Sequence, residues 1–167
     1  GDGEGGLARA SATAEAIALG RDLVKRPGGS LTATQLADEA VAVGESSSLE
    51  VELWDRERLT EERCGGILGV NAGSSEEPRL VRLTWRPEGE SRATLHLVGK
   101  GITFDTGGLN LKTFEGMKEM KIDMGGAAAV IGAMKAIATH SPDITVVGTC
   151  CCTDNQPGPT ATKPGDV

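Results

Sequence analysis

The sequence predicts an α/β fold, built as a three-layer mixed sheet with helices on both faces. Segments with helical periodicity alternate with strand-like segments along the 167 residues, and this alternation is typical of α/β domains. One strand segment near the C-terminal end is apolar at almost every position, as expected in the middle of a sheet covered on both faces. Hydrophobic residues make up 38% of the chain, which is enough for one core.

The first predicted element is a helix over residues 7–24. Leu7, Ile17 and Val24 belong to a series of residues at helical spacing. The helix is expected to end at Pro27, which is followed by two glycines.

A second helix is predicted over residues 30–44. Thr32 or Thr34 is the expected N-cap, and Gly44 is the expected stop. Two shorter elements are predicted next from alternation and helical spacing, a strand over 49–54 and a helix over 55–63.

The second half of the chain is predicted from glycine-rich and apolar runs. Residues 64–74 (CGGILGVNAGS) are interpreted as a glycine-rich turn. Residues 125–139 are rich in alanine and carry few charges, so they are predicted to form a buried helix. Strands are predicted over 80–85, 94–98 and 144–152.

Charge and hydropathy exclude two classes of partner. The formal net charge is −7, whereas nucleic acids and anionic membrane surfaces attract clusters of Lys and Arg. No apolar run approaches the roughly 20 residues that span a bilayer, and the pattern of a signal peptide is not found at the start. We therefore expect a cytoplasmic protein that binds neither nucleic acid nor membrane.

The four cysteines are interpreted as reduced thiols. Cys150, Cys151 and Cys152 are consecutive and Cys64 stands alone, which matches neither a disulfide framework nor the spacing of a zinc site. The three consecutive thiols are expected to act as small apolar side chains in a buried strand.

The glycine-rich loops raise the alternative of a nucleotide-binding domain. A phosphate-binding P-loop requires Lys followed by Ser or Thr, but Lys100 is followed by Gly101. The glycines of residues 65–73 do not supply the dinucleotide fingerprint either. Thermal stabilisation by nucleotide without a need for divalent metal would favour this alternative.

Lys100, Asp105 and Asp123 are predicted to converge at one edge of the sheet. Lys100 follows the strand-like segment LHLV, Asp105 precedes a sharp Gly-Gly turn, and Asp123 precedes the alanine-rich helix. Ligands of open α/β sheets collect at the carboxyl ends of the strands, and carboxylates there can hold divalent cations. From spacing alone, Lys100 is either an ion-pair partner of these carboxylates or, deprotonated beside a dication, a metal ligand.

The longer stretches of sequence around these residues identify a family more specifically than the spacing of the three residues does. VGKGITFDTGGLNLK (98–112) and MKIDMGGAAAVIGAMKAIA (120–138) together resemble the leucyl aminopeptidase family, the two-metal cytosolic aminopeptidases. CCTDNQPGPTATKPGDV (151–167) is similar to the strand and loop that follow in that family. The Cys-Cys pair at the start of this segment is similar to the corresponding residues of the bacterial peptidase B branch of the family.

The resemblance implies roles for five residues. Lys100 and Asp123 match ligands of the tighter metal, and Asp105 matches a ligand that bridges both metals. Lys112 matches the catalytic lysine that polarises the scissile carbonyl and stabilises the oxyanion. Met120 matches a residue that lines the pocket for the substrate's first side chain, and Lys112 and Asp123 match substrate-binding positions as well. Without the resemblance, Lys112 is interpreted as a solvated charge and Met120 as core.

The activity that the resemblance implies is a metal-dependent aminopeptidase. Two divalent ions, Zn or Mn with Mg as a further option, activate a water that removes the first residue of a peptide with a free N-terminus. Family members form hexamers, so a homo-oligomer is implied. The alternative is an inactive family member that binds peptides or serves as a scaffold.

The same resemblance divides the chain. Residues 1–28 match the interdomain linker helix, and 29–167 match the N-terminal part of the catalytic domain. Two dications carry about four positive charges, but the matched residues supply only two carboxylates and one neutral amine. The family draws its remaining ligands from an N-T-D-A-E-G-R segment after the P-G-D-V match. We therefore expect the first half of a metallo-aminopeptidase catalytic domain, truncated before the remaining active-site segment.

Overall fold

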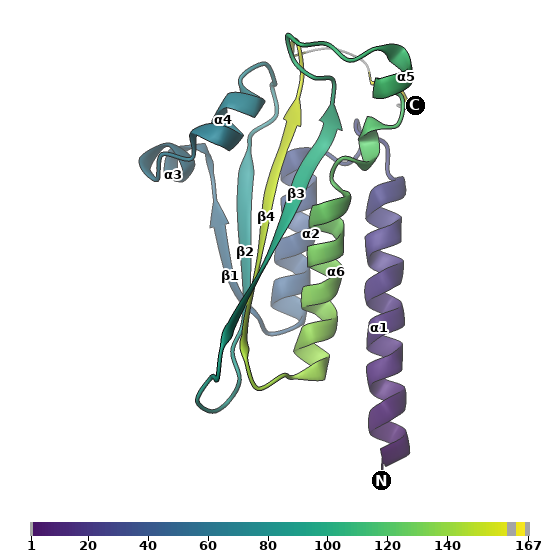
Figure 1. The fold of residues 1–167 in the computed structure, drawn as a ribbon, viewed down its shortest axis with the longest axis vertical. Helices are drawn as coiled ribbons and strands as arrows, with labels where there is room; N and C mark the ends of the chain where they lie inside the picture. Colours follow the sequence, from purple (N-terminus) through teal and green to yellow (C-terminus); the bar gives the residue numbers. More distant parts are fainter. Residues whose placement is uncertain (1, 160–162, 166–167) are drawn as a thin grey trace.

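The computed structural model describes residues 2–159 and 163–165, which form one sheet with helices packed around it (Figure 1). Helices and strands alternate along most of the chain, as the sequence predicts. The elements in chain order are α1 (Asp2–Lys25), α2 (Ala33–Ser46), β1 (Glu50–Trp54), α3 (Arg56–Glu61), α4 (Gly65–Asn71), β2 (Arg79–Trp85), β3 (Thr94–Asp105), α5 (Phe114–Met117), the 3-10 turn η1 (Met120–Ile122), α6 (Gly125–His140) and β4 (Thr145–Asn155).

The sheet is mixed, with the strand order β1-β2-β4-β3. β1 pairs antiparallel with β2, and β2 pairs antiparallel with β4. β3 and β4 are parallel and are joined through α6, so their carboxyl ends meet at the same edge of the sheet. β4 is a central strand, as its apolar sequence predicts.

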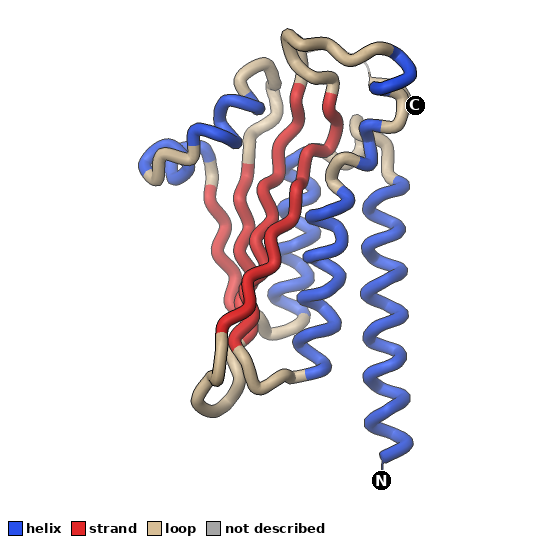
Figure 2. Tube along the Cα trace, viewed as in Figure 1, coloured by secondary structure: helices blue, strands red, loops and turns tan. Residues whose placement is uncertain are grey.

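Helices lie on both sides of the sheet, which confirms the predicted three-layer architecture. Figure 1 shows α2 and α6 against one side, with α1 packed outside α6, and the short helices α3 and α4 on the other. Figure 2 shows the strands of the sheet running between these two groups of helices. The site predicted from the sequence lies at the end of the sheet where β3 and β4 finish.

The core between α6 and the sheet is built mainly from aliphatic side chains, as the scarcity of aromatic residues requires. Ile131 and Met134 of α6 are fully buried. Met134 packs on Gly148 of β4, and a Cβ added to Gly148 would lie 2.6 Å from Cγ of Met134. Burying a side chain of this size contributes about 1.5–3 kcal/mol. α6 is therefore fixed firmly on the two parallel strands.

The start of α6 approaches β3 at backbone contact distance. A Cβ on Gly99 would lie 2.6 Å from the Cα of Ala127, and a Cβ on Gly101 would lie 3.2 Å from the Cβ of Ala127. Only glycine leaves room for this approach. It sets the position of Asp123, which stands two residues before the helix.

Two predicted boundaries are wrong because glycine serves close packing there. α2 continues past Gly44 to Ser46. Gly44 is buried, and a Cβ on it would lie 2.4 Å from Cγ2 of Val51 in β1. β3 runs on to Asp105 instead of ending at Val98, so Lys100 lies within the strand and Asp105 at its end.

Residues 64–74 are not only a turn, since they contain the helix α4. α4 packs on β4. At the start of α2, by contrast, the choice between two caps is settled in favour of Thr32, which forms a capping box with Gln35.

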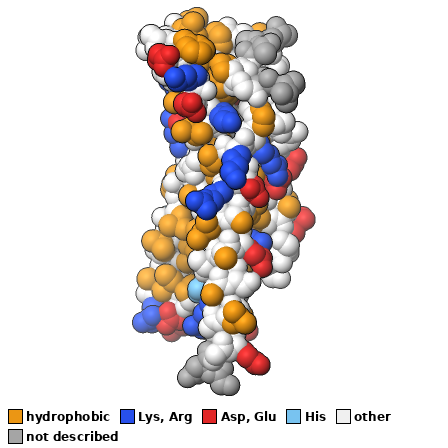
Figure 3. Space-filling model, turned by 90° about the vertical axis from the view of Figure 1, so that its right-hand side faces the viewer, with side chains coloured by type: hydrophobic (Ala, Val, Ile, Leu, Met, Phe, Trp, Pro, Cys, Tyr) orange, Lys and Arg blue, Asp and Glu red, His pale blue; other side chains and the backbone are white. Residues whose placement is uncertain are grey.

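α1 is longer than predicted and buries a different face from the one that the predicted series marks. Ala12, Ala16 and Leu23 are buried, whereas Leu7 and Ile17 are 72% and 55% exposed. Figure 3, which looks onto this side of the molecule, shows hydrophobic side chains exposed over much of the face and Lys and Arg side chains gathered in its upper half.

By length and mean hydropathy one helical stretch, Phe114–His140, could cross a membrane, although Lys135 interrupts its apolar run and no continuous run of that length is present. In the structure it is divided into α5, η1 and α6. α6 buries Ala127, Val130 and Ile131 in the core. Its apolar composition is therefore explained by its place under the sheet.

Candidate functional site

Asp105 is the last residue of β3, and its carboxylate is held from several sides. Oδ1 accepts hydrogen bonds from the backbone N–H of Gly107 at 2.9 Å and from Nδ2 of Asn155 at 2.8 Å. Oδ2 lies 2.5 Å from Nζ of Lys112. Asp105 is buried with 8% of its surface exposed, so these donors replace the water that a free carboxylate would bind.

A tight turn after β3 brings Lys112 back to the carboxylate. Gly107 and Gly108 have φ values of +89° and +65°, in the region that favours glycine. The backbone N–H of Lys112 then donates to the carbonyl of Thr106 at 2.9 Å and closes the turn. The ammonium of Lys112 consequently reaches both the side chain and the backbone carbonyl of Asp105.

Lys100 and Asp123 form the second pair of the site. Nζ of Lys100 lies 3.0 Å from Oδ2 of Asp123, which is an ion-pair distance. The contact does not have hydrogen-bond geometry, so within the described structure this buried oxygen lacks an aligned donor. The side chain of Lys100 is 57% exposed, and the pair is therefore open to solvent on one side.

The carboxylates of Asp105 and Asp123 interact with each other, and their pKa values move in opposite directions. Burial alone would raise the pKa of Asp105, but hydrogen bonds from Lys112, Gly107 and Asn155 outweigh it and lower that pKa. For Asp123, burial raises the pKa and dominates over the ion pair with Lys100. The adjacent Asp105 carboxylate raises the pKa of Asp123 further.

The structure thus brings Lys100, Asp105 and Asp123 together, as the sequence predicts, and Lys112 joins them through its pair with Asp105. Met120 also belongs to this group, because its Sδ lies 3.2 Å from Nζ of Lys112. Met120 is half-buried at the start of η1. The interpretation of Lys112 as a solvated surface charge is wrong, since its side chain is only 29% exposed and is paired.

These residues fit a cation site in part. Two adjacent carboxylates and a buried carboxylate oxygen without an aligned donor are a suitable donor set for a divalent ion. In the described ranges, however, no three His, Cys, Asp or Glu residues gather in one place. The chain therefore presents part of a coordination sphere, with Lys100 and Lys112 balancing the two carboxylates.

Asn155 is a member of the site that sequence analysis missed. It ends β4 directly opposite Asp105 in the parallel ladder, and its side chain donates to that carboxylate. One signal could have found it, because the carboxyl ends of neighbouring parallel strands lie at one edge of a sheet. The predicted strand over 144–152 stopped too early for this argument to be made.

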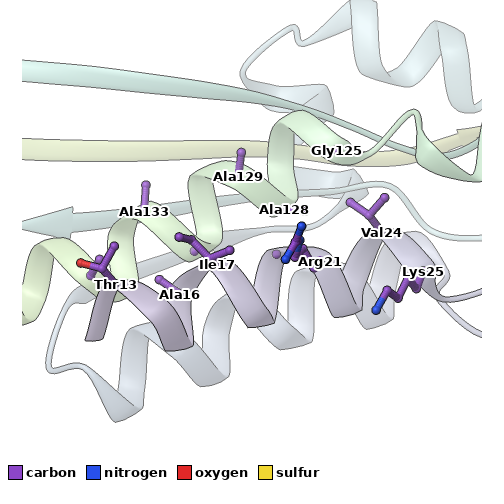
Figure 4. Close-up of a pocket in the computed structure, with 13 residues that line it drawn as sticks. Thr13, Ala16, Ile17, Arg21, Val24, Lys25, Gly125, Ala128, Ala129 and Ala133 are labelled. Carbon is purple, nitrogen blue, oxygen red and sulfur yellow. The ribbon is translucent and has the colours of Figure 1, made fainter. Parts of the chain in front are cut away.

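A hollow of about 620 Å³ lies away from these residues, between α1 and α6 (Figure 4). Ile17 and Val24 of α1 and Ala129 and Ala133 of α6 line it, together with Arg21. Its walls are almost entirely apolar and contain no carboxylate. The chemistry of the chain is therefore concentrated at the end of the sheet and not in this hollow.

Comparison with known proteins shows the family of the chain. The model of the cytosol aminopeptidase family, catalytic domain, matches residues 18–167. A probable cytosol aminopeptidase of Chlorobaculum tepidum is 48% identical over 147 residues, which are 88% of this chain and 29% of that protein. One from Rhodococcus jostii is 45% identical over 161 residues, or 96% of this chain and 32% of that protein.

Solved structures give the same result for the fold. The bottromycin maturation enzyme BotP in complex with Mn has a TM-score of 0.84 at 40% identity, over 95% of this chain and 34% of its own. A leucine aminopeptidase of Caenorhabditis elegans has a TM-score of 0.84 at 36% identity, over 93% of this chain and 32% of its own. The chain spans about a third of the length of these relatives. Its match over nearly the whole described fold shows that it belongs to the cytosol aminopeptidase family, in which it corresponds to part of the catalytic domain.

Proposed function

We propose that the protein to which this chain belongs is a metal-dependent aminopeptidase, which hydrolyses the first residue from peptides with a free N-terminus. The observation that carries the proposal is the cluster at the end of β3. There, two lysines and two interacting carboxylates lie together in a member of the cytosol aminopeptidase family.

Three residues would hold divalent cations. Lys100 and Asp123 are proposed as ligands of one ion, and Asp105 as the ligand shared by two. Lys100 must lose a proton to act as a ligand. An adjacent dication favours the neutral amine and would promote that loss. The mostly exposed side chain of Lys100 can release its proton to solvent.

The ions would be Zn or Mn, with Mg as a further option, and BotP was solved with Mn. Bound there, they supply Lewis acidity and an activated water. The chain's own groups orient the peptide. Asp123 would contact the free amino group, and Met120 would contact the first side chain of the peptide.

Lys112 is proposed as the catalytic lysine. Its Nζ contacts Oδ2 of Asp105 and Sδ of Met120. Lys112 is half-buried, so its charge is screened less than that of a surface lysine. A cation held at this point can donate to the peptide carbonyl and stabilise the oxyanion that develops during attack.

The organisation of the whole protein is proposed from the family. Residues 1–28 would form the linker helix to another domain, and 29–167 the first part of the catalytic domain. The remaining ligands would come from another segment of the catalytic domain, because two carboxylates do not balance two dications. We propose a cytoplasmic homo-oligomer, with a hexamer as the expected form.

The proposal is tested with the full-length protein. After removal of metal by a chelator, we expect no cleavage of leucine p-nitroanilide, and recovery on addition of Mn²⁺ or Zn²⁺. A peptide with a free N-terminus should be cleaved, and its acetylated form should not. Metal-loaded protein that binds peptides but cleaves none of them would support the inactive family member instead.

The ligand assignment has its own test, which is the metal content of purified variants. Asp105→Ala should remove both ions, because its carboxylate is proposed to bind both. Asp143→Ala is the control, since Asp143 forms an exposed ion pair with Arg92. Full metal occupancy in Asp105→Ala, measured by elemental analysis, would refute the assignment.

A further inference from the structure

The two carboxylate oxygens of Asp105 have different hydrogen-bond partners. Oδ1 of Asp105 accepts two hydrogen bonds from neutral donors, from Nδ2 of Asn155 at 2.8 Å and from the N–H of Gly107 at 2.9 Å. Among the described residues, the hydrogen bond to Oδ2 comes from Nζ of Lys112. A cation approaching this carboxylate therefore competes with one ammonium at Oδ2 and with two neutral donors at Oδ1.

Asn155 is itself held in place by its backbone and its surroundings. Its carbonyl accepts from the backbone N–H of Thr106 at 3.0 Å and from the hydroxyl of Thr106 at 2.7 Å. On the other side, a Cβ on Gly108 would lie 2.9 Å from Oδ1 of Asn155. The amide is thus confined between Gly108 and Asp105. Because a carboxylate only accepts hydrogen bonds, the NH₂ group must face Asp105.

We propose that Asn155 is a positioning residue, which fixes the Asp105 carboxylate so that Oδ2 faces Lys112 and the incoming cations. Groups that hold a metal ligand from behind set its orientation, and their loss weakens metal binding or activity. The proposal rests on the proposed function for the identity of the ligand. The contact between Asn155 and Asp105 is independent of it.

A purely structural role can be separated from positioning. Fastening the end of β4 to the turn requires only the backbone carbonyl of Asn155, which pairs with Thr106. A change of the side chain leaves that pairing intact. Asn155→Leu keeps the branched outline of the side chain in a bulkier form and removes the donor, and Asn155→Ser removes most of the reach with a smaller disturbance.

The experiment compares metal binding in the full-length protein and its variants. Metal is removed by dialysis against a chelator, and the Kd for Mn²⁺ is measured by calorimetry. The visible spectrum of the Co²⁺-loaded protein reports the geometry of the ligands, and melting of the metal-free proteins reports their folding. Asn110→Ala is the matched control, because Asn110 lies in the same turn, is exposed and makes no side-chain hydrogen bond within the described structure.

We expect both Asn155 variants to bind Mn²⁺ about 10–100-fold more weakly than the wild type, with an altered Co²⁺ spectrum and a folded metal-free form. Asn110→Ala should match the wild type. An unchanged Co²⁺ spectrum and a Kd within about twofold of the wild type would overturn the proposal. If Asn155→Leu fails to fold, Asn155→Ser decides. A wild type that binds Mn²⁺ but cleaves no peptide refutes the proposed function and leaves this comparison valid.

Discussion

The carboxylates of Asp105 and Asp123 interact directly, although one ends a strand and the other precedes a helix. Each is also paired with its own lysine, Asp105 with Lys112 and Asp123 with Lys100. The two lysines balance the charge of the two carboxylates. A dication bound there would compete with both ammonium groups, and Lys100 must lose its proton to act as a ligand, so binding is expected to release a proton.

The opposite pKa shifts predict opposite effects of neutral substitutions on the metal-free protein. The pKa of Asp105 is lowered by folding, so its stabilisation is present above its unfolded pKa and is lost as pH falls through the folded value. The pKa of Asp123 is raised, so its contribution is present at low pH and is lost as pH rises through the folded value. At pH 7, Asp105→Asn should lower the melting temperature and Asp123→Asn should raise it.

Thermal melts in chelator between about pH 4 and pH 7 check this prediction, since ordinary carboxyl pKa values lie near the lower limit. The advantage of Asp123→Asn should shrink as the pH falls and the wild-type carboxyl takes up its proton. Asp143→Asn, in an exposed ion pair, should change little at any pH. Equal destabilisation by Asp105→Asn and Asp123→Asn at pH 7 would contradict the assigned shifts.

Lys112 is expected to matter for turnover and not for metal content. In the full-length protein, Lys112→Ala should reduce kcat by about 10²-fold or more, as for the loss of one oxyanion donor. Metal content should stay near that of the wild type, because Lys112 is not a proposed ligand. Lys118→Ala is the control, since Lys118 forms an exposed pair with Glu115 one turn away. Steady-state kinetics and elemental analysis on the same preparations separate the two effects, and a loss of metal in Lys112→Ala would contradict this role.

Much of the fold could be predicted because hydrophobic periodicity marks most of its elements. The predictions failed where glycine was read as a break. Gly44 lies inside α2, and Gly99 and Gly101 lie inside β3. At each of these positions glycine makes room for another element. The glycines of α4 have low helix propensity, so this segment was predicted as a turn. The helix forms because it packs on β4.

The sequence predicts that Lys100, Asp105 and Asp123 converge, but it predicts neither Asn155 nor the contacts within the site. The end of a strand and the start of the alanine-rich helix place Asp105 and Asp123 near each other, but the pairing of Lys112 with Asp105 depends on a turn with two positive φ values. The contact of Asn155 with Asp105 depends on the register of β4 against β3 and on the shift in that register between Ile102 and Asp105. Neither the turn geometry nor the register can be read from spacing.

The close approach of α6 to β3 predicts that Gly99 tolerates no side chain. In Gly99→Ala, the new Cβ would lie 2.6 Å from the Cα of Ala127 and from the carbonyl oxygen of Gly126, and backbone cannot move aside as a side chain can. We expect a loss of about 1–3 kcal/mol in the free energy of unfolding. The displaced helix should also move Asp123 away from Lys100 and weaken metal binding.

Gly66→Ala is the matched control for this substitution. Gly66 lies in α4 with nothing within 4 Å of an added Cβ, and alanine favours a helix over glycine. Its free energy of unfolding in urea should be equal to or slightly above that of the wild type. Equal stability of the Gly99 and Gly66 variants would mean that α6 is not packed as closely as described.

The cysteines are predicted to react with alkylating reagents according to burial. Burial raises the pKa of Cys150 to about 12 and that of Cys152 well above its ordinary value, and a thiol that stays protonated is a poor nucleophile. Cys64 is half-exposed at the start of α4. Iodoacetamide at pH 8 should therefore modify Cys64 first and leave Cys150 and Cys152 intact until the protein is unfolded. Peptide mapping by mass spectrometry identifies the labelled residues, and a sample denatured in urea is the control. Early labelling of Cys150 in the native protein would show that β4 is not buried under α6.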